Sequence, residues 1–199
     1  MFSMSKIKAL RNGTKKEAIT RKAAVLFRKK GYNASSMREL AENIGVEAPS
    51  LYNHIGSKNE LLSSICFSIA AGYNDNLVSI ESANESNTWK LQEIIRFHIR
   101  MMITKYDEVF VVNHEWKQMH QPHLSEFILH RKNYEARFLK IIEQGIQSKE
   151  FRNIQPYVAV LTILSSVRGL EIWQRHKKNL PAEVLEEHMI QHLLFGLIN

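Results

Sequence analysis

The chain of 199 residues contains little cysteine, proline or glycine. Its single cysteine, Cys66, excludes an intrachain disulfide and fits a reducing compartment. Four prolines and eight glycines are too few for a loop-rich β protein or a collagen-like chain. No apolar run approaches the roughly 20 residues that span a bilayer, and the amino terminus lacks the apolar core of a secretory signal. We therefore expect a cytoplasmic, globular protein with no membrane partner.

Positive charge is concentrated in the first part of the chain. Residues 1–58 contain twelve Lys and Arg against four Asp and Glu, a net charge of +8. Residues 59–199 contain fifteen against sixteen, a net charge of −1. This asymmetry predicts a polyanionic partner for residues 1–58 alone, although a solvated basic face is the other interpretation.

The apolar pattern is helical nearly throughout, with no alternation of strand length. Apolar residues within Ile19–Phe27 form one face of a first helix, and the capping box Thr14–Glu17 predicts that it begins there. Two more capping boxes, Ser36–Glu39 and Ser57–Glu60, predict later starts. The polar stretch 81–88 is the best linker candidate. Further helices are expected over residues 89–105, 108–119, 124–148, 155–175 and 181–197.

Residues 36–55 have the spacing of a helix–turn–helix. Ala41 is small enough for two helices to cross closely, and Gly45 permits the turn. The apolar residues expected to lock the pair in place are Leu40, Ile44, Val46, Leu51 and Ile55. The second helix presents short polar side chains that suit the major groove: Glu47, Ala48, Ser50, Tyr52, Asn53 and His54.

This second helix contains no Lys or Arg, so phosphate contacts are expected from residues around it. The candidates are Lys15, Lys16, Ser36, Arg38, Tyr52 and Lys58. A helical hairpin without a ligand is the alternative interpretation, and the charge asymmetry disfavours it.

The run from Gly31 to Leu62 resembles the DNA-binding domain of the tetracycline-repressor (TetR) family. It has that family's G-(Y/F) turn, paired hydroxyl residues, (R/D)-(E/D)-(I/L)-A block and LYxHFxxKxxLL tail. Ile55 replaces the usual Phe, Gly56 replaces a frequent Lys or Pro, and two serines replace the usual Thr-Thr. Ile55 is still apolar and Ser36 still offers a capping hydroxyl, so these differences are compatible with the family's fold.

The resemblance implies an all-α homodimer of about nine helices, with a three-helix DNA-binding domain at 1–58 and an effector-binding and dimerisation domain at 59–199. It implies a repressor that a small hydrophobic effector releases from a palindromic operator. By analogy with the family, the DNA backbone would be contacted by Ser36, Tyr52, His54 and Lys58. The residues that would face bases are Ala48, Ser50 and Asn53.

The last two predicted helices are apolar over more than one face, so each must bury more than one side. Pairing with the same helices of a second copy would satisfy both, and a monomer core is the alternative. The predicted interface residues are Val160, Leu161, Leu164, Val167, Met189, Leu193, Leu194 and Leu197.

Aromatic, methionine and histidine residues of the middle helices predict an apolar effector pocket, unless they form ordinary core. The predicted lining is Phe97, His98, Met101, Met102, Phe110, His114, Trp116, Tyr134, Phe138 and Trp173. The segment Arg131–Gly145 is similar to TetR-type regulators of fatty-acid and aromatic-acid catabolism. That similarity implies an acyl-CoA or fatty-acid effector as one hypothesis.

Two other functions stay open, a metal-responsive regulator and an effector-free architectural DNA-binding protein. His188 and His192 lie one helical turn apart and could chelate a transition metal with a third ligand such as Glu187 or Glu115. Surface histidines are the commoner reading, so we assign no metal ligands and no cofactor. An enzyme is not expected, because the common catalytic and nucleotide-binding motifs are missing and Cys66 lies in an apolar helix.

Overall fold

The computed structural model describes residues 4–53, 55–176 and 180–198. Within these residues the chain forms ten α-helices and one 3₁₀ helix, and the β-type pairing is a single bridge between Phe151 and Ile198. The predicted all-α class is confirmed.

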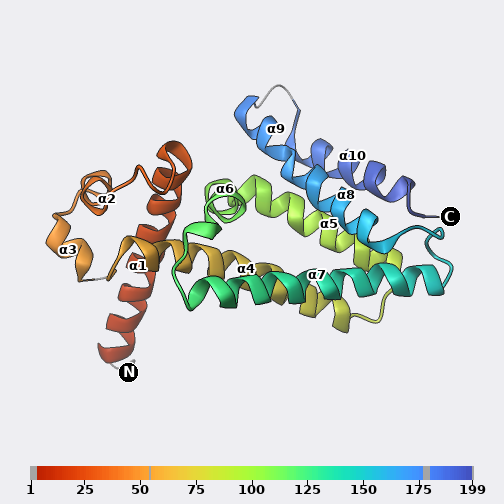
Figure 1. Cartoon of the computed structure of the whole chain (residues 1–199), viewed down its shortest axis with the longest axis horizontal. Helices are drawn as coiled ribbons and strands as arrows, with labels where there is room; N and C mark the ends of the chain where they lie inside the picture. The colour runs from red at the N-terminus through yellow and green to blue at the C-terminus, as the bar shows by residue number, and fades with distance from the viewer. Residues whose placement is uncertain (1–3, 54, 177–179, 199) are drawn as a thin grey trace. The chain divides into compact units, whose positions relative to one another are not determined.

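The chain forms two compact units (Figure 1). The first unit is Met1–Ile69 together with Asp107–Phe127, and the second is Ala70–Tyr106 together with Ile128–Asn199. The functional boundary predicted after residue 58 lies inside the first unit. The packing of the chain divides it after residues 69, 106 and 127 instead. The boundary after residue 58 therefore remains a prediction about function.

The first unit is built around the helix–turn–helix. Its complete helices are α1 (Met4–Lys30), α2 (Met37–Ile44), α3 (Ala48–Tyr52) and the 3₁₀ helix η1 (Trp116–Gln118). It also contains parts of α4 (Lys58–Ser82), α6 (Tyr106–His114) and α7 (His123–Gln147). Large side chains that are fully buried in this unit include Phe27, Leu40, Leu51, Leu61 and Phe127.

Hydroxyl caps begin two of these helices where the capping boxes predict. The Ser36 hydroxyl accepts from the backbone N–H of Glu39 at 3.2 Å, and that of Ser57 accepts from Glu60 at 3.0 Å. Gly45 ends α2 with a φ of 81°, a left-handed conformation that glycine adopts without a Cβ clash.

Two predicted boundaries are wrong. Helix α1 extends back to Met4, so the capping box at Thr14 lies inside the helix. Good helix formers fill most of the preceding stretch, and a capping sequence permits a helix to start without forcing it to. The helix expected over 155–175 is divided at Gly169 into α8 (Pro156–Arg168) and α9 (Leu170–His176), which raises the number of helices above nine.

The second unit packs several helices around α5 (Asn87–Thr104), which contacts α8, α9 and α10 (Ala182–Phe195). Pro156 is the first residue of α8 and Pro181 immediately precedes α10, as their sequence positions predict. Helix α4 ends at Ser82, so the linker before α5 is shorter than the predicted polar stretch.

A distant carboxylate stabilises the start of α5. Glu150 accepts hydrogen bonds from the backbone N–H groups of Asn87 and Thr88, at 3.1 and 2.8 Å, and from the Ser148 hydroxyl at 2.9 Å. Burial alone would raise the pKa of Glu150, but these hydrogen bonds outweigh it and lower the pKa to about 2. The negative charge is also favourable at a helix amino terminus.

We expect Glu150→Gln to lower the free energy of unfolding by about 2 kcal/mol at pH 7, because charge-assisted hydrogen bonds are lost. The folded pKa lies below the ordinary value of 4.5, so this stabilisation is complete above that value and is lost as the pH falls toward 2. Urea denaturation at pH 7 and pH 3 measures the difference. Glu143→Gln, at an exposed position of α7, is the control; a loss that does not depend on pH would contradict the assignment.

Candidate DNA interface and effector region

Helix α3 buries one apolar side chain and leaves its polar side chains in solvent. Leu51 is buried, together with Ile55 just beyond the helix. The exposed side chains are those of Glu47, Ser50, Tyr52 and Asn53. Ala48 is half-buried, and His54 lies outside the described residues. The described part of the predicted base-reading face is therefore open to a ligand.

The turn between α2 and α3 is the tight one that Gly45 predicts. The backbone N–H of Val46 donates to the Ala41 carbonyl at 3.0 Å, and Ala41 is buried. The Val46 side chain, by contrast, is 38% exposed, so its predicted locking role is wrong. Val46 lies in the turn itself, outside the two helix faces that pack together.

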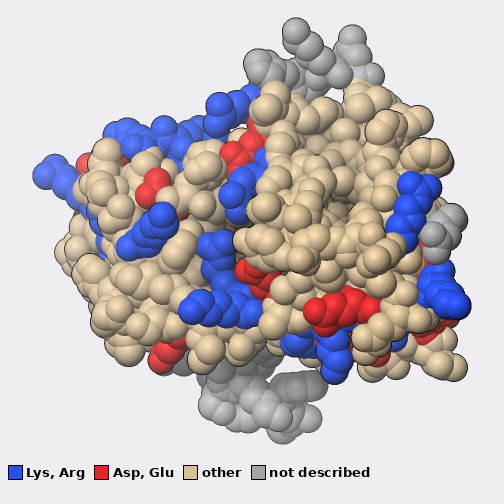
Figure 2. Space-filling model, turned by 45° about the vertical axis from the view of Figure 1, so that its right-hand side comes forward, with Lys and Arg blue, Asp and Glu red and all other residues tan. Residues whose placement is uncertain are grey.

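Most of the predicted phosphate contacts are exposed. These residues are Lys15, Lys16, Ser36 and Arg38. Lys16 pairs with Glu60 at 2.9 Å and lowers the pKa of that carboxylate, and Arg38 pairs with Glu42 at 3.3 Å. Exposed pairs contribute little stability, so both cations can exchange a carboxylate for a phosphate. Figure 2 shows runs of Lys and Arg on the face that it draws.

Lys58 binds the protein itself. Its ammonium donates to the carbonyl oxygens of Tyr32 and Ser35, each at 2.9 Å, and lies 4.4 Å from the centre of the Tyr32 ring. Both carbonyls belong to the turn between α1 and α2. Lys58 thus fixes the approach to the helix–turn–helix, and its phosphate contact stays a prediction.

Asn59 joins three segments of the first unit, which the sequence did not indicate. Its amide nitrogen donates to the Tyr32 hydroxyl at 3.2 Å and to the Gln118 carbonyl at 3.0 Å. Its amide oxygen accepts from the backbone N–H of His120 at 3.1 Å. An Asn at a helix start suggests a local cap, and nothing in the sequence points to partners so distant.

Four of the predicted effector residues meet in the second unit, together with Tyr73 of α4. We call Tyr73, Phe97, His98, Tyr134 and Phe138 the ring cluster. The ring of Tyr73 stacks on His98 with centres 4.4 Å apart and lies 5.8 Å from Phe97. The His98 Nε2 and the Tyr134 hydroxyl are 2.7 Å apart. Tyr73 was missed because it lies in a long apolar-rich helix, where an aromatic residue suggests ordinary core.

Burial keeps the polar rings of this cluster neutral over a wide pH range. It lowers the pKa of His98 to about 3, so the imidazole is uncharged at neutral pH. It raises the pKa of Tyr73 and of Tyr134, so both phenols keep their protons. The ring cluster therefore offers neutral hydrogen-bonding groups between aromatic surfaces.

The other predicted effector residues lie elsewhere. Met101 and Met102 are buried on α5, and Trp173 of α9 is half-buried. Three residues belong to the first unit: Phe110, His114 and Trp116. Phe110 lies 4.3 Å from His114 between ring centres, and Trp116 lies 6.1 Å from Phe127. A common role for all ten residues stays a prediction.

The predicted dimer residues fall into two groups. Val160, Val167 and Leu194 are buried within the single chain and offer no open surface to a second copy, so their intermolecular contact stays a prediction. Helices α8 and α10 both contact α5, so an apolar face of each is used within the chain. The accessible members are Leu161, which is 51% exposed, and the half-buried Leu164, Met189, Leu193 and Leu197.

Exposed apolar side chains continue beyond the predicted set. On α8, Tyr157 and Val158 are about as exposed as Leu161. Figure 2 shows a broad area without charged side chains on the face that it draws. A groove of about 530 Å³ also lies between α8 and α10. Its lining is Ser166, Leu180, Val184, Leu185, His188, Met189, His192 and Leu193.

His188 and His192 lie one turn apart on α10, as the sequence predicts. The His192 Nδ1 lies 3.1 Å from the His188 carbonyl oxygen. A carbonyl oxygen only accepts hydrogen bonds, so Nδ1 must carry a proton to make this one. Among the described residues, no group of three or more His, Cys, Asp or Glu is arranged to bind a metal ion. No described helix is long and apolar enough to cross a membrane.

A second groove, of about 740 Å³, lies between α5 and α10. Arg96 and Arg100 line it, and both bind Glu186 on the opposite helix. Arg96 Nε lies 3.2 Å from that carboxylate, and Arg100 makes two bonds of 2.9 Å to it. Arg96 also binds Glu93, so the two cations are balanced by two protein carboxylates.

Family models match both parts of the chain. Residues 19–65 match the model described as bacterial regulatory proteins of the tetR family. Residues 84–197, more than half of the chain, match the model described as the tetracyclin repressor-like C-terminal domain. The chain belongs to the TetR family.

This TetR-family chain is also similar to a curated relative and to solved structures. The HTH-type transcriptional repressor KstR2 of Mycobacterium tuberculosis is 22% identical over 181 residues, which cover 88% of each chain. The solved structure of that organism's ketosteroid transcriptional regulator KstR2 has a TM-score of 0.86 at 19% identity, over 93% of this chain and 95% of that one. The structure of AibR with isovaleryl coenzyme A and operator DNA has a TM-score of 0.77 at 23% identity, over 89% and 96%.

These matches confirm the resemblance that the run Gly31–Leu62 carries. This TetR-family protein is a DNA-binding transcriptional repressor and is not an enzyme. The likeness to the solved structures shows the fold alone.

In this TetR-family protein we expect Lys58→Gln to weaken DNA binding without changing its salt dependence, because the Lys58 ammonium binds carbonyl oxygens. Each lost phosphate contact would lower the slope of log K against log salt by about 0.9. Fluorescence anisotropy with a DNA duplex between about 50 and 200 mM salt measures the slope. Lys15→Gln, at an exposed lysine of α1, is the control that should lower it; a lower slope for Lys58→Gln would identify a phosphate contact instead.

Proposed function

We propose that the protein is a homodimeric repressor that binds a palindromic operator and is released from it by a small hydrophobic effector. The observation that supports this most directly is the exposed polar face of α3, seated on a buried Leu51. A helix presented in this way fits the major groove, where base edges carry a readable pattern of donors and acceptors.

Within this proposal, residues of and beside α3 divide by role. Ala48, Ser50 and Asn53 face bases, and Glu47 lies at the edge of the same surface. Contacts to the DNA backbone come from Lys15, Lys16, Ser36, Arg38, Tyr52 and His54, and Lys58 supports them by holding the turn before α2. Phosphate contacts supply most of the affinity, and base contacts supply the specificity.

The proposed dimer forms through α8 and α10. The exposed apolar run of α8 and the groove beside α10 provide a surface that a second copy can cover. Two-fold symmetry then presents two α3 helices to half-sites about 34–36 Å apart, which requires a palindromic operator.

The proposed effector binds in the second unit. The ring cluster supplies an aromatic surface with a few polar groups, the usual lining of a small-molecule site. An acyl-CoA or a fatty acid is the leading candidate, from the similarity of Arg131–Gly145 to regulators of acyl catabolism. The solved complex of AibR with isovaleryl coenzyme A supports an effector of this class.

Operator binding is the direct test of the proposed function. Fluorescence anisotropy with duplexes from the region upstream of the coding sequence should reveal a site bound roughly 10³-fold or more above random DNA. Adding acyl-CoAs and fatty acids of graded chain length should release the protein from that site. An architectural protein would show no site preference at any salt concentration, and that result would contradict the proposal.

Asn53→Ala should change which operator sequence is preferred, because the exposed Asn at the end of α3 can make paired hydrogen bonds to adenine. A selection from a random-sequence duplex library measures the preferred site for both proteins. Glu85→Ala, at an exposed position outside the first unit, is the control. An unaltered site profile for Asn53→Ala would remove its base-reading role.

Leu161→Glu should yield monomers at micromolar concentration and reduce operator affinity at least 100-fold, because it places a charge on the proposed dimer face. Sedimentation velocity measures the oligomeric state. Leu129→Glu on α7 is the matched control, since Leu129 is 58% exposed and carries no part of that face. An intact dimer of Leu161→Glu would exclude this interface.

A further inference from the structure

The ring cluster contains a hydrogen-bonded pair that is enclosed but not sealed. The rings of His98 and Tyr134 are bound to each other at 2.7 Å, and Phe138 behind them is completely buried. His98 nevertheless keeps 8% of its surface accessible, and Tyr73 and Tyr134 are half-buried. Tyr73 and Tyr134 therefore keep accessible surface that a small molecule can contact.

The His98–Tyr134 pair has hydrogen-bonding capacity to spare. A neutral imidazole and a phenol together carry one N–H and one O–H, and the bond between the two rings uses only one of them. Whichever ring donates, one donor and one acceptor are left over. Within the described part of the chain, neither ring makes a second hydrogen bond. A carbonyl or hydroxyl oxygen of a ligand would satisfy the spare donor.

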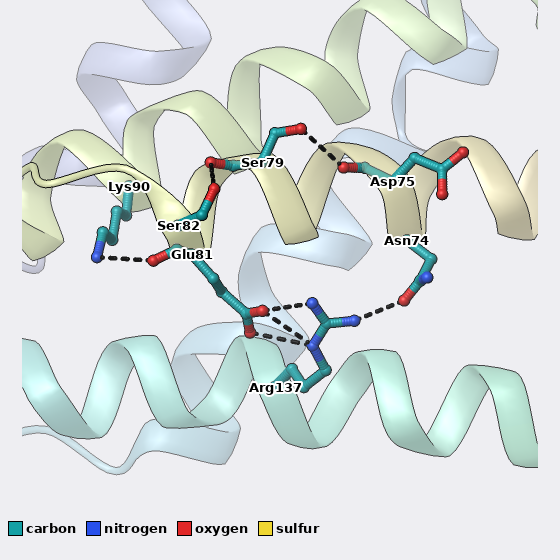
Figure 3. Close-up of polar contacts among 7 residues, drawn as sticks. All are labelled: Asn74, Asp75, Ser79, Glu81, Ser82, Lys90 and Arg137. Atoms are coloured by element: carbon teal, nitrogen blue, oxygen red, sulfur yellow. Dashed lines mark hydrogen bonds and ion pairs between the residues drawn. The ribbon is translucent and has the colours of Figure 1, made fainter.

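The cation beside the ring cluster is already bound. Arg137, one turn after Tyr134 on α7, makes a forked contact with the Glu81 carboxylate, with Nε at 3.0 and 3.2 Å from its two oxygens. Another nitrogen of the guanidinium donates to the Asn74 amide oxygen at 2.5 Å. Figure 3 shows Arg137 directed between these two residues of α4.

A free carboxylate would consequently find no counter-charge at the ring cluster. His98 is uncharged at neutral pH, both tyrosines are protonated, and Arg137 would have to leave Glu81. A buried carboxylate without a partner is strongly disfavoured, whereas a carbonyl or hydroxyl group loses little on entering a site with a matching donor.

We propose that the ring cluster binds a neutral oxygen of the effector, a carbonyl or hydroxyl group on an apolar skeleton, and rejects the corresponding free carboxylate. This inference rests on the proposed function, since it assumes that an effector enters the second unit. It narrows the effector from fatty acid or acyl-CoA to the thioester, ester, ketone or alcohol form.

Three probes with one skeleton test this selectivity: cyclohexyl methyl ketone, methyl cyclohexanecarboxylate and cyclohexanecarboxylate. Their dissociation constants are measured at pH 7.5 by NMR titration of the full-length protein labelled in its histidine rings. The ketone and the ester should bind at least tenfold more tightly than the carboxylate and should shift the His98 resonance. A carboxylate that binds as tightly as the ketone would overturn the proposal, and so would the absence of binding by all three.

Tyr134→Phe removes one oxygen and keeps the ring, so circular dichroism should show an unchanged fold. It should weaken ketone binding at least fivefold, whereas the matched control Tyr157→Phe, at an exposed tyrosine of α8, should have no effect. Unchanged ketone affinity in Tyr134→Phe would overturn the proposal. Operator binding by the same samples separates the two ideas: protein that binds a specific duplex but shows no neutral-oxygen selectivity contradicts only this inference, and protein that binds no duplex contradicts the proposed function.

Discussion

The proposed DNA recognition by α3 depends on the placement of a helix that is too short to be stable alone. Helix α3 has five residues, and an isolated helix of that length does not form in water. Its position comes from the burial of Leu51 and Ile55 and from the turn at Gly45. The first turn of α4 also helps to hold α3 in place, because Lys58 and Asn59 bind the turn that leads into α2.

The second unit contains polar rings that are enclosed and uncharged at neutral pH, namely those of Tyr73, His98 and Tyr134. The His98–Tyr134 hydrogen bond joins one donor of the pair to one acceptor, and the Glu81 carboxylate binds the nearby Arg137 cation. Together these contacts leave an aromatic region whose polarity is limited to neutral donors and acceptors. A charged group does contribute at the start of α5, where the Glu150 carboxylate accepts hydrogen bonds from the helix amino terminus.

Local signals in the sequence predicted the helices and the DNA-binding motif well, since capping serines, the turn glycine and apolar spacing act over a few residues. The same reasoning failed where distant segments decide. It could not tell that Val160 packs inside its own chain whereas Leu161 next to it faces solvent, because both suit an apolar helix. It also missed Asn59 and Tyr73, whose partners lie far along the chain.

The first unit is discontinuous, and this has a bearing on how such proteins can be recombined. Asp107–Phe127 supplies Met119 and Phe127 to its core, and the Phe127 ring lies 5.9 Å from that of Phe67. The polypeptide thus passes between the units three times, so a single cut cannot separate the first unit from the second. A chimera that takes only residues 1–69 from a protein of this kind would have an incomplete core. The segment Asp107–Phe127 must be transferred with them.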